Sequence, residues 1–188
     1  MAAEAFVFLR RLAKKGVQIG GLRSDSRAIR PGDVFLAYPG EHADGRAFIG
    51  NAIQAGAAAV IWEREGYEWD ERQTTPNLSV DNLKQFAGLL ADEVYGQPSS
   101  RLDVIAATGT NGKTYCAAWI AEAMQATGQR VALIGTLGMG YPGALQTNPN
   151  TTPDALVLQE ALKRYADEGA QCVVMEASSI GLEQGRMN

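Results

Sequence analysis

Residues 103–114, with the sequence DVIAATGTNGKT, decide the fold of this protein. The apolar run before the loop predicts a strand, and the Ala-rich stretch after Lys113 predicts a helix. Between them, Gly109 and Gly112 permit backbone conformations in which several N–H groups converge on one anion, where the helix N-terminus also points. The segment is therefore predicted to be a strand, a phosphate-binding loop and a helix.

The loop chemistry points to a nucleoside triphosphate. Lys113 is placed to reach the outer phosphates as the catalytic cation, and the hydroxyl of Thr114 is placed to ligate the Mg²⁺ that bridges them. The residues predicted to contact ATP are Gly109, Thr110, Asn111, Gly112, Lys113, Thr114 and Tyr115. Ala107 stands where the general Walker A pattern has Gly, and the alternative is an ordinary strand-to-helix turn rich in small residues. The flanking elements and the Gly-Lys-Thr offset favour ATP and Mg²⁺ as ligands.

The composition predicts a globular protein that acts on small molecules. The chain has 188 residues, 46% hydrophobic and 20% charged, enough to bury a core in one large or two small domains. A net charge of −4 and a pI near 5.1 argue against nucleic acid or a membrane surface as partner. No signal peptide or apolar run of roughly 18 residues is found, so we expect a cytoplasmic location. The protein is also expected to be a monomer. Cys116 and Cys172 lack metal-ligand spacing and are predicted to be buried small apolar residues, not a disulfide.

The first half of the chain predicts a small α/β domain. Helices are expected over residues 5–15 and 48–55, and buried strands over residues 57–62 and 78–80. The segment 22–38 is expected to form two strands joined by a Pro-Gly turn. Asn82 is expected to cap a helix that runs to residue 95 and belongs to the second domain, so the domain boundary is placed near residue 82.

The second half alternates strand and helix, which predicts parallel strands whose carboxyl ends gather at one edge. Strands are expected up to residue 107 and over residues 131–136 and 171–175, with helices over residues 113–127 and 151–169. The second helix is expected to begin with a threonine cap and Pro at its first position, and a Gly-rich loop is expected to precede it, up to Asn150. Glu176 then lies beside the phosphate loop and is predicted to hold magnesium with Thr114, the alternative being a strand-end acid that faces water.

Six blocks of the sequence, in order, resemble the Mur ligase family. They are SDSR (residues 24–27), PGDVF (31–35), HADG (42–45), TGTNGKT (108–114), NTTPD (150–154) and MEASSIGL (175–182). The resemblance implies an α/β protein in which residues 1–82 form a small UDP-binding domain. It implies that residues 83–188 begin a central P-loop parallel-sheet ATPase domain that is truncated here, with an uncovered sheet edge and apolar face.

The resemblance also implies the substrate contacts. Ser24, Ser26, Glu41, His42 and Ala43 would contact the UDP-sugar. The muramoyl-dipeptide would be held by Asn150, Thr151, Thr152, Ser178, Gln184 and Arg186. Hydroxyls, amides and a guanidinium suit a diphosphate, a sugar and carboxylates. The sequence departs from the family pattern at Tyr115, where a second Thr is usual, and at Ile180, where a His is common.

The implied activity is ATP-dependent ligation of an acid to an amino acid in peptidoglycan synthesis. ATP phosphorylates the D-glutamyl carboxylate of UDP-N-acetylmuramoyl-L-alanyl-D-glutamate, and the amine of a diamino acid attacks the acyl phosphate. Diaminopimelate is favoured over lysine, although the residues that select the diamino acid are expected outside this sequence. The chain by itself is therefore expected to be inactive in ligation.

Three other functions are alternatives to this one. The Mur ligase that adds D-alanyl-D-alanine fits the blocks at residues 150–153 and 175–179 less well. Folylpolyglutamate synthase has nothing like residues 1–100 before its phosphate loop. A P-loop binding module without bond-forming chemistry remains open, and binding of the UDP-muramoyl-dipeptide to residues 1–82 would distinguish it.

Overall fold

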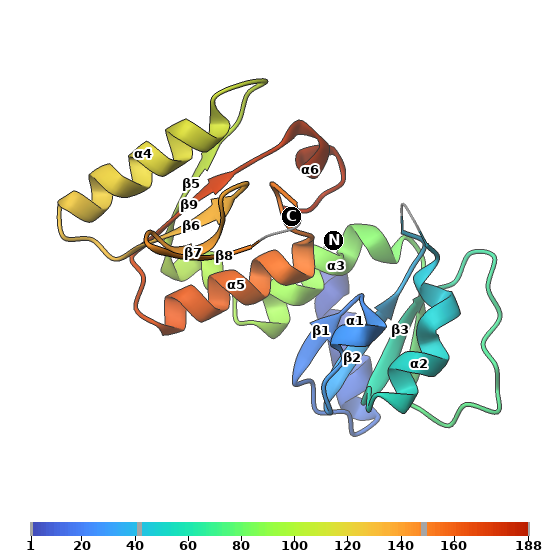
Figure 1. Ribbon diagram of the computed structural model, residues 1–188. Coiled ribbons are helices and arrows are strands. Elements are labelled where there is room, and N and C mark those ends of the chain that lie inside the picture. Colours follow the sequence, from blue (N-terminus) through green and yellow to red (C-terminus); the bar gives the residue numbers. More distant parts are fainter. Residues whose placement is uncertain (1, 41–42, 148–149, 188) are drawn as a thin grey trace. The chain divides into compact units, whose positions relative to one another are not determined.

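The computed structural model describes residues 2–40, 43–147 and 150–187 (Figure 1). The chain divides into two compact units, Met1–Val94 and Tyr95–Asn188. Each unit has its own sheet, and both sheets contain parallel strands with helices packed on them. The predicted mixed α/β fold is therefore confirmed.

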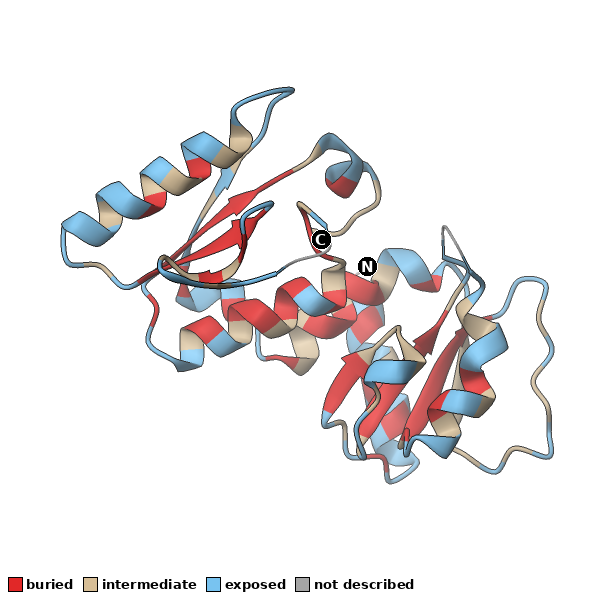
Figure 2. Ribbon diagram, in the orientation of Figure 1, coloured by how far each residue is buried: buried red, intermediate tan, exposed pale blue. Residues whose placement is uncertain are grey.

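The first unit is a four-stranded parallel sheet covered by helices. Its strands, in order across the sheet, are β1 (Gly21–Arg23), β2 (Asp33–Ala37), β3 (Ala59–Glu63) and β4 (Asn77–Val80). Its helices are α1 (Ala2–Lys14), α2 (Ile49–Gln54) and α3 (Leu83–Val94), with the short 3₁₀ helices η1 (Ser26–Ala28) and η2 (Gly45–Phe48). The strands β2 and β3 are buried at every position, as expected for parallel strands (Figure 2).

The predicted pair of strands joined by a Pro-Gly turn is wrong. β1 pairs with β2 in parallel, with Gly21 opposite Asp33. The chain returns to the start of β2 through η1 and a turn in which the N–H of Asp33 donates to the carbonyl of Arg30 at 3.0 Å. The Pro-Gly turn therefore leads into β2, and the polar residues 24–27 lie in a crossover between parallel strands.

The helix α3 belongs to the first unit, so the boundary predicted near residue 82 is corrected to the end of this helix. Its buried residues, Leu90 among them, pack toward α1, β1 and β3, and Phe86 meets Phe8 of α1 edge-to-face at 5.5 Å. The expected cap at its start is also replaced. The carboxylate of Glu63, at the end of β3, accepts from the N–H groups of Asn82 at 3.1 Å and Leu83 at 2.7 Å.

The second unit is a five-stranded mixed sheet in the order β5-β9-β6-β7-β8. Its strands are β5 (Asp103–Ala107), β6 (Val131–Gly135), β7 (Gly138–Tyr141), β8 (Ala144–Gln146) and β9 (Cys172–Glu176). Its helices are α4 (Lys113–Ala126), α5 (Ala155–Asp167), α6 (Ser179–Glu183) and the 3₁₀ helix η3 (Pro98–Arg101). The strands β5, β9 and β6 are parallel, and their expected ranges agree with the structure to within a residue or two.

The expected Gly-rich loop before residue 150 is mostly an antiparallel hairpin, β7 and β8, which extends the sheet beyond β6. The glycines of β7 allow its backbone to lie close to that of β8. A Cβ on Gly138 would lie 2.4 Å from the carbonyl oxygen of Gln146, and one on Gly140 would lie 2.7 Å from that of Ala144. The sequence predicts a loop here because glycine is common in loops, and the close approach of two strands is not visible in the sequence.

Two helices cover opposite faces of this sheet. Ala117 and Ala121 of α4 pack on Leu133 and Val174, whereas α5 packs through residues such as Leu162 on the other face. The helix α5 begins two residues later than a threonine cap would place it. Its N-cap is Asp154, whose Oδ1 accepts from the N–H groups two and three residues on.

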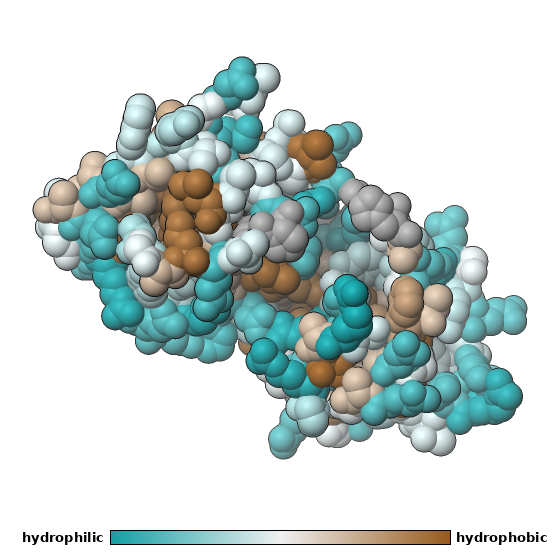
Figure 3. All heavy atoms as spheres, viewed as in Figure 1, coloured by the Kyte–Doolittle hydropathy of each residue, from teal (hydrophilic) through white to brown (hydrophobic). Residues whose placement is uncertain are grey.

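The surface of the second unit leaves some apolar side chains exposed. The edge strand β5 is exposed or half-buried throughout, in keeping with the expected uncovered edge. The exposed large hydrophobic side chains of this unit are Val104, Tyr115, Trp119, Leu137, Val157, Ile180 and Leu182. On the face seen in Figure 3, brown hydrophobic patches are surrounded by hydrophilic residues. Within the described residues, no helix combines the length and the apolar character that crossing a membrane requires.

Candidate functional site

The phosphate loop connects β5 to α4 as predicted. Gly109 (φ 143°) and Gly112 (φ 82°) both have positive φ, a conformation that a Cβ disfavours. Among the described residues, no protein acceptor is found for the backbone N–H groups of residues 109–115, and the first N–H with one is that of Cys116, which donates to the carbonyl of Gly112 at 2.9 Å. The loop therefore presents a series of free N–H groups at a helix N-terminus, which is the arrangement that binds phosphate.

Lys113 supplies the positive charge at this loop. Its ammonium donates to the carbonyl oxygen of Gly109 at 2.7 Å, so the side chain folds back over the loop. A bound phosphate would offer the ammonium a charged acceptor in place of a neutral carbonyl, and charge-assisted bonds are the stronger ones. The position of Lys113 is thus compatible with its predicted role, which stays a prediction.

Glu176 is the buried carboxylate of the site. It ends β9, the strand between β5 and β6, and lies opposite Ala107 in the register. Its exposed fraction is only 2%. The hydroxyl of Thr114 donates to its Oε2 at 2.9 Å, and the backbone N–H of Thr136 donates to its Oε1 at 2.7 Å. The structure therefore brings the predicted pair Thr114 and Glu176 together, and the alternative of a strand-end acid that faces water is wrong.

The donor set fits Mg²⁺. Hydroxyl and carboxylate oxygens are its usual protein ligands, and no ion pair of Glu176 is found in the described part of the chain. No cluster of three or more His, Cys, Asp or Glu residues suited to a metal is found there either. A cation would thus depend on the phosphates of a nucleotide for its other ligands, as is common for Mg²⁺.

Thr136 is a site residue that the sequence analysis missed. Besides its N–H bond, its hydroxyl donates to Oε2 of Glu176 at 3.3 Å and lies 3.0 Å from the hydroxyl of Thr151. The sequence carried a signal for it, because a polar residue at the carboxyl end of a parallel strand lies at the ligand-binding edge. That rule was applied to Glu176 but not to Thr136.

The residues predicted to hold the muramoyl-dipeptide gather beside Glu176, with Thr152 at their centre. The Thr152 hydroxyl donates to the carbonyl of Glu176 at 3.0 Å and accepts from the N–H of Ser178 at 3.1 Å. The guanidinium of Arg186 donates to the carbonyl of Thr152 at 2.9 Å and to Oε1 of Gln184 at 2.6 Å. Five of the six predicted residues are linked in this way or through Thr136, whereas Asn150 is exposed beside them.

The burial of Thr152 changes its expected role. Its exposed fraction is 1%, and its hydroxyl is already bonded to neighbouring residues. A ligand therefore cannot easily reach the Thr152 side chain. Its hydroxyl instead fixes Ser178, which caps α6 by accepting from the N–H of Gly181 at 3.0 Å. Thr152 is the buried member of the cluster, whereas Thr151, Ser178, Gln184 and Arg186 are half-buried and Asn150 is exposed.

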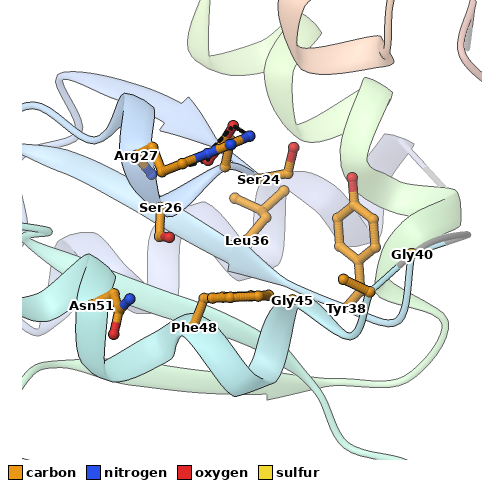
Figure 4. A pocket seen from close by; sticks show the side chains of 11 residues that line it. Ser24, Ser26, Arg27, Leu36, Tyr38, Gly40, Gly45, Phe48 and Asn51 are labelled. Atoms are coloured by element: carbon orange, nitrogen blue, oxygen red, sulfur yellow. Dashed lines mark hydrogen bonds and ion pairs between the residues drawn. The ribbon is translucent and has the colours of Figure 1, made fainter.

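A cavity of about 570 Å³ lies in the first unit between η1 and the start of α2 (Figure 4). Three residues predicted to contact the UDP-sugar line it, Ser24, Ser26 and Ala43. Glu41 and His42, the other two, lie outside the described residues. The structure adds further lining residues that the sequence analysis did not single out, namely Asp25, Arg27, Leu36, Tyr38, Phe48 and Asn51.

The cavity has an aromatic and a charged part. The aromatic rings of Tyr38 and Phe48 line it, which suits the flat ring of a nucleobase, while Ser24 and Ser26 offer hydroxyls (Figure 4). The guanidinium of Arg27 bonds to the carboxylate of Asp25 at 2.7 Å and thereby lowers the pKa of that carboxyl. A volume of this size is in the range of small-molecule sites.

The two departures from the family pattern are both exposed. Tyr115 is 69% exposed, and its ring lies 6.0 Å from that of Trp119 one turn further along α4. Ile180 is 58% exposed on α6. The two cysteines also differ, because Cys172 is buried as expected whereas Cys116 is exposed.

Comparison with known proteins identifies the family. Residues 107–188 match the Mur ligase middle domain, and residues 8–95 match the domain described as Mur ligase family, catalytic domain. The chain belongs to the Mur ligase family. This agrees with the phosphate loop and with the sheet that carries Glu176.

The individual relatives are more specific. The chain is 49% identical over 171 residues to the UDP-N-acetylmuramoyl-L-alanyl-D-glutamate--2,6-diaminopimelate ligase of Nitrosomonas europaea. The aligned region covers 91% of this chain and 33% of the relative. The chain is 45% identical over 175 residues to the protein of the same name from Pseudomonas aeruginosa, with 93% and 36% covered. The chain thus spans about a third of the length of these curated relatives.

Solved structures agree with the fold. A structure of a UDP-N-acetylmuramoyl-L-alanyl-D-glutamate--2,6-diaminopimelate ligase matches with a TM-score of 0.72 and 36% identity, over 90% of this chain and 34% of that chain. The MurF ligase of Thermotoga maritima in complex with ADP matches with a TM-score of 0.56 and 24% identity, over 85% and 32%. At that identity the second match supports the fold alone.

Proposed function

We propose that this protein is an ATP-dependent amide ligase of peptidoglycan synthesis. It joins a diamino acid, diaminopimelate in preference to lysine, to UDP-N-acetylmuramoyl-L-alanyl-D-glutamate. The observation that carries the proposal is the position of Glu176. Its Oε2 accepts from the hydroxyl of Thr114 of the phosphate loop at 2.9 Å and from the hydroxyl of Thr136 at 3.3 Å, and the Thr136 hydroxyl lies 3.0 Å from that of Thr151 in the acceptor cluster. The nucleotide site and the acceptor site therefore share one buried carboxylate, and the names of the relatives supply the identity of the acceptor.

The residues divide the work of phosphoryl transfer. The free N–H groups of residues 109–115 hold the phosphates of ATP, and Lys113 neutralises charge on the transferring phosphoryl group. Thr114 and Glu176 would hold Mg²⁺, which when bound supplies charge stabilisation at the phosphates. Thr151, Ser178 and Arg186 orient the acceptor so that its D-glutamyl carboxylate faces the phosphate loop.

The chemistry balances in two steps. A carboxylate oxygen of the acceptor attacks the γ-phosphorus of ATP, and ADP leaves with the electrons of the broken P–O bond. The amine of the diamino acid then attacks the acyl carbon, loses a proton and displaces inorganic phosphate, leaving the amide. The UDP end of the acceptor is assigned to the cavity of the first unit, where Ser24 and Ser26 offer hydroxyls to phosphate and sugar oxygens.

The experiment that tests this function detects the product directly. Because the residues that select the diamino acid are expected outside this chain, the assay uses the intact protein, meaning this chain within a protein of its relatives' full length. It is incubated with ATP, MgCl₂ and UDP-N-acetylmuramoyl-L-alanyl-D-glutamate, together with diaminopimelate, lysine or D-alanyl-D-alanine. Mass spectrometry is expected to find the UDP-muramoyl-tripeptide with diaminopimelate, in a 1:1 ratio with ADP. The Lys113→Ala variant serves as a control for contaminating host ligase. ADP formation without any ligated product would contradict the proposal and favour a nucleotide-binding module without ligase chemistry.

A further inference from the structure

Two threonine hydroxyls contact the carboxylate of Glu176, and a third contacts one of them, so that together they connect the phosphate loop to the acceptor cluster. The Thr114 hydroxyl donates to Oε2 at 2.9 Å, and the Thr136 hydroxyl donates to the same oxygen at 3.3 Å. On the far side, the hydroxyls of Thr136 and Thr151 are 3.0 Å apart, and either can be the donor. Thr136 is therefore the only side chain in this chain of contacts that touches both Glu176 and Thr151.

The number of protons limits how these bonds can coexist. A threonine hydroxyl has one proton to donate. When Thr136 donates to Glu176, the bond between the two threonines requires Thr151 to donate to Thr136. When Thr151 gives its proton to another acceptor, the bond survives only if Thr136 turns its proton toward Thr151. The Oε2 of Glu176 then loses one of its two hydroxyl donors.

A carboxylate of the acceptor is the kind of group that would take the proton of Thr151, because a carboxylate only accepts hydrogen bonds. Its binding would thus release a lone pair on Oε2 of Glu176, the oxygen that faces Thr114 of the phosphate loop. A lone pair without a competing donor binds a cation more strongly. The direction of the effect follows, since acceptor binding at Thr151 should strengthen cation binding at Glu176.

We propose that Thr136 is a positioning residue that couples the acceptor carboxylate at Thr151 to the cation at Glu176. This inference rests on the proposed function, because it uses the acceptor of that reaction. By linkage the coupling is reciprocal, so the cation strengthens acceptor binding by the same factor. The device favours a metal–nucleotide complex that is complete only when the carboxylate to be phosphorylated is present.

The structure offers a substitution that removes only this link. Thr136→Val keeps the β-branched shape, and it keeps the backbone N–H that donates to Oε1 of Glu176 at 2.7 Å. Thr136→Ser keeps the hydroxyl and is the conservative rescue. Thr127→Val is the matched control, because it removes another exposed threonine hydroxyl of this unit, one that donates to the carbonyl of Met124.

The experiment measures coupling in the intact protein without turnover. Calorimetry gives the Kd of UDP-N-acetylmuramoyl-L-alanyl-D-glutamate in the presence of ADP, with MgCl₂ or with EDTA. Electron paramagnetic resonance gives the Kd of Mn²⁺ with ADP, with and without the same acceptor. In the wild type each ligand is expected to tighten the other by the same factor, within the roughly 5- to 150-fold range of coupled sites. In Thr136→Val the factor is expected to fall to about one. Mn²⁺ without acceptor is then expected to bind this variant about as tightly as it binds the wild type with acceptor, because the competing hydroxyl on Oε2 of Glu176 is gone.

The outcomes separate this inference from the proposed function. Restored coupling in Thr136→Ser and unchanged coupling in Thr127→Val would support the role of the hydroxyl. Wild-type coupling in Thr136→Val, or acceptor and metal binding without coupling in the wild type, would overturn the inference while leaving the proposed function intact. Weaker Mn²⁺ binding in Thr136→Val without acceptor would overturn it in favour of Thr136 as a direct metal ligand. Failure of the wild type to bind the acceptor at all would overturn both.

Discussion

The substitution Gly135→Ala tests the placement of Glu176 without changing any group that contacts a ligand. A Cβ on Gly135 would lie 2.3 Å from Oε1 of Glu176 and 2.9 Å from its Cδ and Cγ. The backbone of Gly135 does not have a positive φ, so alanine is strained there only by this contact. The carboxylate must therefore move away from β6.

The size of the effect follows from the distances. To reach a separation of 3.0 Å, the short end of real Cβ contacts, Oε1 has to move by at least 0.7 Å, which is 3.0 minus 2.3. If Oε1 moves directly away from the N–H of Thr136, this bond lengthens from 2.7 Å to about 3.4 Å, beyond the usual range for an N–H···O hydrogen bond. Losing one hydrogen bond to a charged group costs about 1.5–3 kcal/mol. The carboxylate then needs this free energy to return to the position from which it binds the metal. The affinity of the nucleotide complex for Mg²⁺ therefore decreases roughly 10- to 150-fold.

The assay is a titration of Mn²⁺ into the protein with ADP, followed by electron paramagnetic resonance, with urea unfolding to establish that the variant is folded. Gly50→Ala is the matched control. It lies in α2 with nothing within 4 Å of the added Cβ, and it is expected to leave metal binding unchanged. A folded Gly135→Ala variant with the metal affinity of the wild type would refute the idea that the position of Glu176 determines metal binding.

Three further substitutions or modifications test other parts of the structure. Lys113→Ala is expected to weaken Mg·ATP binding by about 1.5–3 kcal/mol in calorimetry. The control Lys163→Ala removes only a surface ion pair with Asp167 and should leave Mg·ATP binding unchanged. Equal affinities for both variants would contradict the role of Lys113. Glu63→Ala should lower the free energy of unfolding in urea by about 1–2 kcal/mol, because it removes the carboxylate that caps α3. Glu71→Ala, at an exposed position, is the control, and an equal or larger loss of stability in that control would contradict the cap. Burial raises the pKa of the Cys172 thiol and lowers its thiolate fraction at neutral pH. Iodoacetamide should therefore alkylate the exposed Cys116 first, as judged by peptide mass spectrometry. Faster labelling of Cys172 would contradict this and show that the core of the second unit opens readily.

The phosphate loop and the position of Glu176 could be predicted from the sequence because their signals are local. Gly109, Gly112 and Lys113 fix the loop within a few residues, and the alternation of strand and helix places Glu176 at the correct sheet edge. The parallel order of the neighbouring strands follows from the same alternation. These features depend on spacing along the chain more than on distant contacts.

The parts that the sequence analysis got wrong depend on contacts between distant residues. Glu63 caps α3 from 20 residues away, and this contact helps to place the helix in the first unit. The parallel pairing of β1 and β2 depends on burial by other elements, which a Pro-Gly turn does not reveal. Gly138 and Gly140 allow two strands to approach, a need that is visible only once Gln146 and its neighbours are placed.

The sequence also did not predict the roles of two individual hydroxyl groups in the site, those of Thr136 and Thr152. Thr136 ended a predicted strand, which places it at the ligand-binding edge of the sheet, but that position does not identify Glu176, 40 residues later, as its partner. Thr152 was expected to touch the ligand, but its burial assigns its hydroxyl to Ser178 and to the backbone of β9. Which of two adjacent threonines faces the ligand depends on local backbone geometry, and a motif match does not determine it.

The central claim is that the acceptor carboxylate is phosphorylated by ATP, and oxygen transfer measures that step directly. UDP-N-acetylmuramoyl-L-alanyl-D-glutamate labelled with ¹⁸O in its D-glutamyl carboxylates is turned over by the intact protein with ATP, MgCl₂ and diaminopimelate in unlabelled water. Mass spectrometry of the inorganic phosphate is expected to find one ¹⁸O atom in each phosphate released, because the oxygen that attacks phosphorus leaves with it. Unlabelled phosphate formed alongside a ligated product would show that the bond is made without an acyl phosphate and would contradict the account.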